Sequence, residues 1–228
     1  YESKAKGVDK GERDMGSVFT KDGIMLNWDR RYADAVTLFV TDTKGTANTA
    51  DDTYVERLGI LDQDGKTFDP YRWISGVIDS RGRVWLGTAN GIVEIAEPAK
   101  MTNPTSRITR LKVPRNDGTN YADYLLSGMD IKAIAIDSAN RKWVGTADNG
   151  LYLISADGLE ILAHYTAADS PLLSDEITDL AIRQSTGEVM IATDLGLCSF
   201  QGDASTAFPT LEKGNIKVYP NPVRPEYN

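Results

Sequence analysis

The sequence predicts an all-β protein of the β-propeller class, and a repeated segment is the main reason for this prediction. Residues 130–154 read as three short strands joined by two tight turns, Asp137-Ser138-Ala139-Asn140 and Asp148-Asn149-Gly150. Residues 73–95 repeat this pattern closely, and residues 177–200 repeat it more loosely. Units of this kind bury their faces by stacking on one another.

The copies align at the positions that decide packing and turn formation. A large apolar residue, a small residue and a threonine recur in each copy, as Trp85, Gly87 and Thr88; Trp143, Gly145 and Thr146; and Met190, Ala192 and Thr193. The threonines lie 58 and 47 residues apart, which is typical of propeller blades and too long for leucine-rich or ankyrin units. We interpret the large apolar residues as wedges between blades; the alternative is that they stack on a ligand.

A less regular blade is expected ahead of these copies. Residues 16–28 indicate a hairpin, residues 35–41 a strand, and residues 56–62 and 66–68 a second hairpin around Gln63-Asp64-Gly65. The count is then about four blades of four antiparallel strands, which is expected to be part of a larger propeller. The domain prediction has four parts: a lead-in at 1–14, blades at 15–203, a linker at 204–215, and the truncated start of another domain at 216–228.

Two motifs resemble known families. The pattern Ile-x-x-Asp-x-x-Gly-x-x-Trp-x-Gly-Thr-x-x-Gly-Leu resembles the two-component regulator propeller repeat of Bacteroidetes. Residues 218–223, Val-Tyr-Pro-Asn-Pro-Val, resemble the opening of the C-terminal sorting-type β-sandwich of type IX secretion proteins. A propeller followed by a linker and Tyr-Pro-Asn-Pro is similar to the order in the PorZ-like surface proteins, although the first seventy residues carry almost none of this resemblance.

The resemblance implies a non-catalytic binding or scaffold domain of an exported bacterial protein, in the periplasm or at the outer-membrane surface. A protein partner or a surface polysaccharide would be its ligand, in secretion or anchoring at the outer membrane. One alternative is the ligand-sensing periplasmic propeller of a hybrid two-component sensor kinase. Another is an enzyme that acts on glycans with paired carboxylates. The repeat-position acids Asp79 and Asp137 are better explained as caps of the strand-to-turn junction.

Composition narrows the classes of partner. The net charge of −8, with no basic stripe, argues against nucleic acid and against an anionic membrane surface. No apolar run of 18 residues is present, so no membrane span is expected. The sequence has one cysteine, Cys198, so an internal disulfide is not possible. It has one histidine, His164, without a second histidine or a cysteine partner, so we expect neither a zinc site nor a catalytic triad. We therefore expect no cofactor and no metal, and we interpret the acidic loop around Asp51 and Asp52 as solvated.

Tyr121 and Tyr124 are the candidate ligand-binding residues. They lie in a long polar stretch, residues 114–127, and binding residues are often carried on loops of a rigid scaffold. The alternative is that this loop packs its own aromatic side chains. A partial ring would also leave two blade faces uncovered. Three assemblies would solve this: a small closed ring, an arc capped by its terminal segments, or a homodimer that completes one propeller.

Overall fold

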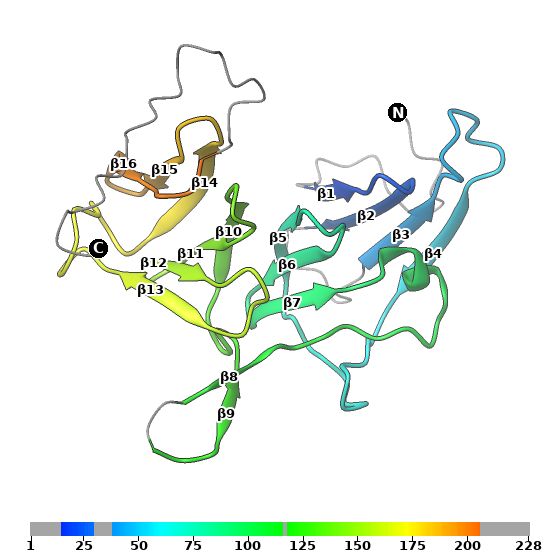
Figure 1. The fold of residues 1–228 in the computed structure, drawn as a ribbon. Helices are drawn as coiled ribbons and strands as arrows, with labels where there is room; N and C mark the ends of the chain where they lie inside the picture. The colour runs from blue at the N-terminus through cyan, green and yellow to red at the C-terminus, as the bar shows by residue number, and fades with distance from the viewer. Residues whose placement is uncertain (1–14, 30–37, 116–117, 206–228) are drawn as a thin grey trace, which may run out of the picture.

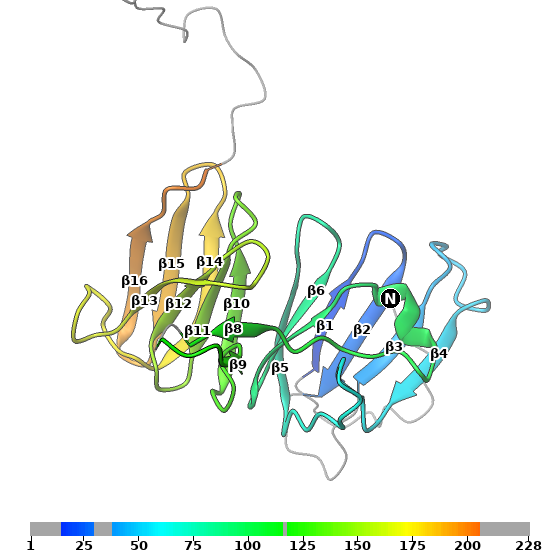
Figure 2. The same ribbon diagram turned by 60° about the horizontal axis from the view of Figure 1, so that its bottom comes forward.

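The structure is a computed structural model that describes residues 15–29, 38–115 and 118–205. These residues form an all-β molecule whose main sheets follow one another along an arc (Figures 1 and 2). The predicted lead-in at 1–14 and the predicted domain start at 216–228 lie outside the described residues, as does most of the predicted linker at 204–215.

We call the four main sheets blades 1 to 4. Blade 1 contains β1 (Met15–Phe19), β2 (Ile24–Asp29), β3 (Leu38–Asp42) and β4 (Thr53–Arg57). Blade 2 contains β5 (Trp73–Ile78), β6 (Val84–Thr88) and β7 (Gly91–Ile95). Blade 3 contains β10 (Ile131–Ile136), β11 (Lys142–Thr146), β12 (Leu151–Ile154) and β13 (Ile161–Tyr165). Blade 4 contains β14 (Ile177–Arg183), β15 (Glu188–Thr193) and β16 (Gly196–Gln201).

The strands of each blade pair antiparallel in chain order, and the first strand of each blade faces the first strand of the next. Two further elements connect blades 2 and 3. The short 3-10 helix η1 (Pro98–Thr102) follows blade 2, and a separate hairpin pairs β8 (Lys112–Pro114) with β9 (Ala122–Tyr124). This hairpin projects from the outer side of the arc in Figure 1. The predicted loop at 114–127 therefore contains regular structure.

The first turn of each clear repeat is organised by its aspartate. The Oδ1 atom of Asp79 accepts the backbone N–H groups of Arg81 and Arg83 at 2.9 and 3.0 Å. Asp137 makes the same two bonds, at 3.0 and 2.9 Å, to Ala139 and Arg141. The prediction that these acids cap the junction is confirmed. Asn140 has a φ of 62°, the left-handed conformation that Gly82 and Gly187 have at the aligned positions of the other copies.

The recurrent threonine closes the second turn. The hydroxyl groups of Thr88, Thr146 and Thr193 donate to the carbonyl oxygens of Gly91, Gly150 and Gly196 at 2.8 to 2.9 Å. Each hydroxyl also accepts a backbone N–H from the same turn. These threonines are buried, yet valine, which has the same shape, could not make the two hydrogen bonds of the hydroxyl group. This explains why a polar residue recurs at this buried position.

The core consists of apolar clusters between neighbouring blades. Trp85 is fully buried among residues of blade 3, and Trp143 is 3% exposed among residues of blade 4, so their predicted role as wedges is confirmed. The glycine two positions later lets the next blade approach closely. A Cβ atom on Gly87 would lie 2.7 Å from the Cγ2 atom of Ile131 in the neighbouring blade, and Gly145 meets Ile177 in the same way.

The prediction for blade 1 was wrong at its outer strand. That strand is β4, Thr53–Arg57, whereas the sequence pattern suggested residues 56–62. The buried guanidinium of Arg57 donates to the carbonyl oxygens of Met101 and Ser106, at 2.9 Å each, which holds β4 against the η1 segment. The turn at residues 62–66 lies instead at the outer edge of blade 2, where the backbone of Asp62 forms an isolated β-bridge with Ile108. Long-range contacts, invisible to local alternation, decide both placements.

Candidate functional site

Tyr124 holds the β8–β9 hairpin in place. Its ring lies 3.8 Å from the guanidinium carbon of Arg110, measured to the ring centroid, and 5.3 Å from the Lys112 ammonium. Its hydroxyl donates to Asp64 at 3.0 Å, and Lys112 pairs with the same carboxylate at 2.9 Å. The Lys112 and Tyr124 hydrogen bonds lower the pKa of Asp64. Tyr124 therefore matches the alternative in which the loop packs its own aromatics.

Tyr121 is differently placed, because 69% of it is exposed just before β9. Its ring centroid lies 5.8 Å from the guanidinium carbon of Arg115. Arg115 makes two hydrogen bonds to Asp123, at 2.7 and 2.8 Å, which keep the guanidinium plane in one orientation. The two candidate tyrosines thus share a hairpin but differ in what their side chains can do.

Arg115 also lines a groove of about 380 Å³ between the hairpin and blade 3. The residues that line it are Val113, Pro114, Arg115, Leu159, Glu160 and Ile161. Leu159 lies in the turn before β13 and Ile161 is the first residue of β13; they are 47% and 43% exposed. We call this feature, together with Tyr121, the outer groove. It offers an apolar wall, an aromatic ring and a planar cation, which suits binding and provides no nucleophile with an adjacent base.

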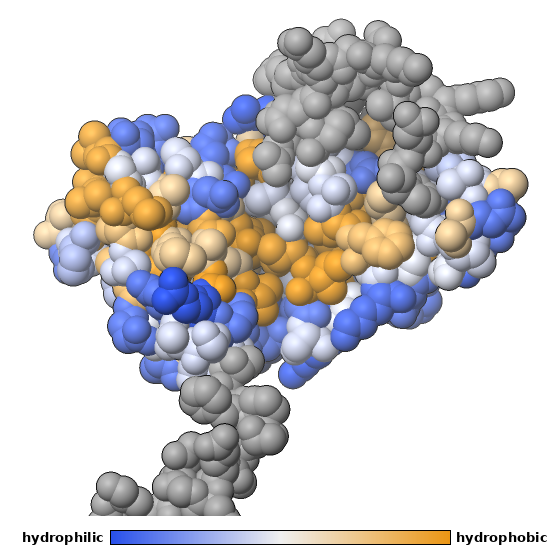
Figure 3. Space-filling model, turned by 90° about the horizontal axis from the view of Figure 1, so that it is seen from above, coloured by the Kyte–Doolittle hydropathy of each residue, from blue (hydrophilic) through white to orange (hydrophobic). Residues whose placement is uncertain are grey.

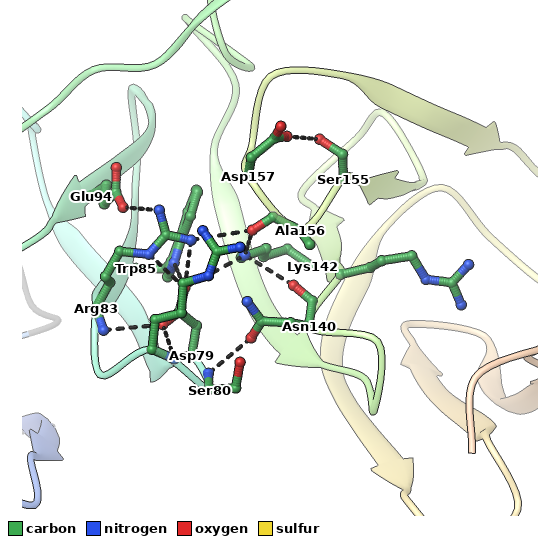
Figure 4. Close-up of polar contacts among 12 residues, drawn as sticks. Asp79, Ser80, Arg83, Trp85, Glu94, Asn140, Lys142, Ser155, Ala156 and Asp157 are labelled. Carbon is green, nitrogen blue, oxygen red and sulfur yellow. Dashed lines mark hydrogen bonds and ion pairs between the residues drawn. The ribbon is translucent and has the colours of Figure 1, made fainter. Parts of the chain in front are cut away.

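A second group of ionisable side chains is largely buried. Figure 4 shows it between blades 2 and 3, where Asp79, Arg83, Glu94 and Lys142 gather around Trp85. The Lys142 ammonium donates to the carbonyl oxygens of Asn140 and Ala156, at 2.9 and 2.6 Å. We call this group the inter-blade charge cluster.

The cluster is closely connected on its blade 2 side. Arg83 pairs with Asp79 at 2.8 Å and with Glu94 at 2.6 Å. The indole N–H of Trp85 donates to Asp79 at 3.1 Å, and the Lys142 ammonium lies 4.2 Å from the Trp85 ring centroid. Lys142 and Asp79 are 3.7 Å apart. Two cations and two carboxylates therefore balance one another, with Lys142 and Asp79 fully buried and Arg83 and Glu94 mostly buried.

Burial dominates the electrostatics of the cluster. It lowers the pKa of Lys142 to about 8, against the attraction of Asp79. Burial also raises the pKa of Glu94, with Arg83 opposing the shift. For Asp79 burial would raise the pKa as well, but hydrogen bonds from Trp85 and Arg83 outweigh it and the pKa is lowered.

Perturbed groups of this kind are often catalytic, but these are arranged as a structural joint. The side chains of Lys142 and Asp79 are 0% exposed, so neither can touch a substrate in this conformation. Their partners are protein groups from two blades, and the bonds connect those blades. The repeat alignment could have revealed Lys142, because the aligned residues Val84 and Val189 are apolar.

The remaining sequence candidates lie apart from both features. The His164 ring stacks on Tyr152, with centroids 4.0 Å apart, and its Nε2 atom lies 2.7 Å from the carbonyl oxygen of Asn149. Cys198 is a half-buried free thiol on β16. Across the described ranges, no group of three His, Cys, Asp or Glu side chains is placed to hold a metal ion. No helix in the described part of the chain is long and apolar enough to cross a membrane.

Comparison with known proteins finds a similar solved structure. PorZ, an essential surface component of the type IX secretion system of Porphyromonas gingivalis, has a solved structure that superposes with a TM-score of 0.76 at 29% identity. The match covers 93% of this chain. The chain is similar to PorZ over this region. The resemblance predicted from the repeats is thereby confirmed, and the PorZ match covers 29% of the length of PorZ itself.

More distant structures agree on the fold. The extracellular domains of a putative one-component system and a putative hybrid two-component system from B. thetaiotaomicron match with TM-scores of 0.56 and 0.52. Their identities are 16% and 19%; the matches cover 81% and 90% of this chain, and 23% of each of those chains. No family model and no curated protein matches the sequence. At such identities the sensor domains are evidence for the fold alone.

Proposed function

We propose that this PorZ-like chain is a non-catalytic binding and scaffold segment of an exported bacterial protein, acting in secretion or anchoring at the outer membrane. The observation that carries this proposal is the match to PorZ, whose description places it at the bacterial surface in the type IX system. The buried state of the inter-blade charge cluster and the binding character of the outer groove support a role without catalysis.

The outer groove is the surface we assign to the partner, and a protein is the partner that its chemistry favours. Tyrosine and arginine are the residue types most enriched among energetically dominant interface contacts, and Tyr121 and Arg115 lie together beside the apolar wall of Leu159 and Ile161. The groove volume of about 380 Å³ can accept one or two anchoring side chains. A surface polysaccharide, the other ligand that the resemblance implies, is the competing outcome of the test.

The test compares the unchanged chain with a Tyr121→Ser/Arg115→Ala double variant. Each would be incubated with purified outer-membrane proteins and, separately, with purified surface polysaccharide of a bacterium that has a type IX system. We expect one protein to bind the unchanged chain and to bind the variant at least about tenfold more weakly, as loss of central anchors implies. Tyr71→Ser is the matched control, because Tyr71 is also exposed, at 58%, but lies in another loop.

Equal capture by all three forms would remove the outer groove as the binding surface. Tyr121-dependent binding of polysaccharide alone would replace the protein partner with a glycan. Turnover of either ligand would contradict the non-catalytic role.

The ends of the arc support a homodimer as a further part of this proposal. Leu197 of blade 4 is 70% exposed, whereas Ile92 and Leu151 at the aligned positions of blades 2 and 3 are 3% and 0% exposed. Phe19 of blade 1 is 59% exposed. Figure 3 looks toward the open side of the arc and shows apolar surface running across it. Light scattering over a wide dilution series would give the mass of two chains if a second copy covers these faces, and of one chain if it does not.

A further inference from the structure

The first strands of three blades share an irregularity at the same place. Pairing to the second strand slips by one residue after Trp73 in blade 2, after Ile131 in blade 3 and after Ile177 in blade 4. The extra residues are Ile74, Lys132 and Thr178. A β-bulge of this kind redirects the side chain that it inserts, and such bulges are common beside functional sites. Because the bulge recurs in β5, β10 and β14, it is a regular feature of the first strand of these blades.

A cavity of about 240 Å³ lies where the four first strands meet. Each of these strands contributes to its lining, and β2 adds a tryptophan: the residues are Ser17, Trp28, Ser75, Gly76, Lys132, Ala133, Ile134, Thr178 and Asp179. Two of the three bulged residues, Lys132 and Thr178, are among them. We call this space the axial cavity. It is distinct from the outer groove, which lies on the other side of the sheets.

Two residues of the axial-cavity lining carry buried polar groups for which no hydrogen-bond partner is found among the described residues. They are the indole N–H of Trp28, a residue 1% exposed, and the hydroxyl of Ser75. A buried donor without a partner is unfavourable, so such groups usually have a ligand or an ordered water beside them. The Trp28 ring is held in place by close neighbours, since a Cβ atom on Gly76 would lie 2.6 Å from its Cη2 atom. Its N–H therefore points in a direction fixed by packing.

Opposite charges line the axial cavity on neighbouring blades. Lys132 of blade 3 lies 3.1 Å from Asp130, and the same carboxylate is 3.0 Å from Arg72, so two cations share one anion. Asp179 of blade 4 accepts the Leu180 N–H through Oδ1 at 2.8 Å. The cavity thus has a donor-rich, cationic side and a carboxylate from the next blade.

We propose that the axial cavity binds a small zwitterion of the size of a free amino acid. Its carboxylate would pair with Lys132 and its ammonium group with Asp179, with the Trp28 ring beside it in the cavity lining. The volume of about 240 Å³ is below the roughly 300–1,000 Å³ of pockets for drug-sized ligands, which favours a ligand of the size of an amino acid over an oligosaccharide. This inference does not depend on the proposed function of the outer groove.

The test is a calorimetric screen of the unchanged chain against the free L-amino acids. Acetate and methylammonium are the probes that carry one charge of the zwitterion. We expect saturable binding of at least one amino acid and much weaker binding of both single-charge probes. In Asp179→Asn and Lys132→Met the affinity should fall at least about tenfold, because each loses one charge-assisted contact. Lys21→Met, which removes an exposed lysine far along β1–β2, should bind normally.

A second measurement reads the site without any substitution. The NMR signal of the Trp28 indole N–H should shift on saturation, while the indole signal of Trp143 in the joint between blades 3 and 4 should stay in place. The proposal is overturned if no amino acid binds, if acetate binds as tightly as the best amino acid, or if Asp179→Asn binds unchanged. It is also overturned if saturation leaves the Trp28 signal unmoved.

Discussion

The joint between blades 2 and 3 contains a lysine and a glutamate at two positions where the joint between blades 3 and 4 has apolar residues. Lys142 in the first joint aligns with Val189 in the second. Lys142 pairs with Ile136 of β10, and Val189 pairs with Ile182 of β14. Glu94, which faces Trp85 across the sheet, aligns with Leu153, which faces Trp143. One repeat therefore supports two chemically different joints within a single chain.

The two joints nevertheless share their hydrogen-bonded frame. Trp85 donates to Asp79 at 3.1 Å and Trp143 donates to Asp137 at 3.3 Å. The arginine of each turn bonds the same carboxylate through Nε, at 2.8 Å for Arg83 and 2.7 Å for Arg141. The frame alone is thus sufficient to join two blades. A buried ion cluster is weak evidence for extra stability, because desolvation opposes the attraction between its members.

Removing the carboxylate of Asp79 should have the largest effect on the free energy of unfolding, and a larger one than the same change in the other joint. Asp79→Asn leaves Lys142 and Arg83 with only Glu94, and breaking a buried ion pair typically costs about 3–5 kcal/mol of unfolding free energy. Asp137→Asn removes an acceptor where no lysine is buried, so a loss of about 1–3 kcal/mol is expected. Urea unfolding followed by tryptophan fluorescence measures both. Equal losses would mean that the charges add nothing to the difference.

Replacing Lys142 and Glu94 by the residue types of the other joint should show that the effects of these two charges on stability are coupled. Lys142→Val leaves two carboxylates facing Arg83, and Glu94→Leu leaves two cations facing Asp79. The double variant copies the residues of the other joint, so it should be more stable than the sum of the single effects predicts, by about 1–3 kcal/mol. The double-mutant cycle in urea is the measurement. Additive losses would contradict the coupling.

The pH dependence of stability should also distinguish the joints. The pKa of Lys142 is about 8 in the folded protein and 10.5 ordinarily, so between these values the unfolded chain binds more protons. The free energy of unfolding contributed by Lys142 therefore rises with pH across that window, by at most about 1.4 kcal/mol per pH unit. Comparing urea unfolding of the unchanged chain and Lys142→Val at several pH values isolates this term. A constant difference between them would contradict it.

The smallest effect is expected at the surface of the second joint. Arg141 pairs there with Asp203, whose side chain is 82% exposed, while its bond to Asp137 remains inside. Asp203→Ala should lower the free energy of unfolding only slightly, and less still at high salt, because solvent screens this exposed pair. Urea unfolding with and without added salt tests this. A larger loss would mean that the exposed pair matters more to this joint than the shared frame does.

The repeats by themselves determined the fold class, the turns and the wedge positions. The roles of Asp79 and Asn140 could be assigned from the sequence because they are local: a carboxylate reaches its own turn, and a left-handed residue is needed at one backbone position. Such constraints leave the same residue type at the same spacing in each copy, so alignment within one chain detects them.

Tertiary structure alone decided the outer strand of blade 1, the different roles of Tyr121 and Tyr124, and the charged joint around Lys142. Each depends on partners far away in sequence: Arg57 on the segment after blade 2, Tyr124 on Asp64, and Lys142 on Asp79. A side chain's burial and its ionic partners are set by what the chain brings beside it. No local pattern of polar and apolar residues specifies these long-range contacts. For this reason the alternation pattern misplaced the outer strand of blade 1 and did not show that Lys142 is buried.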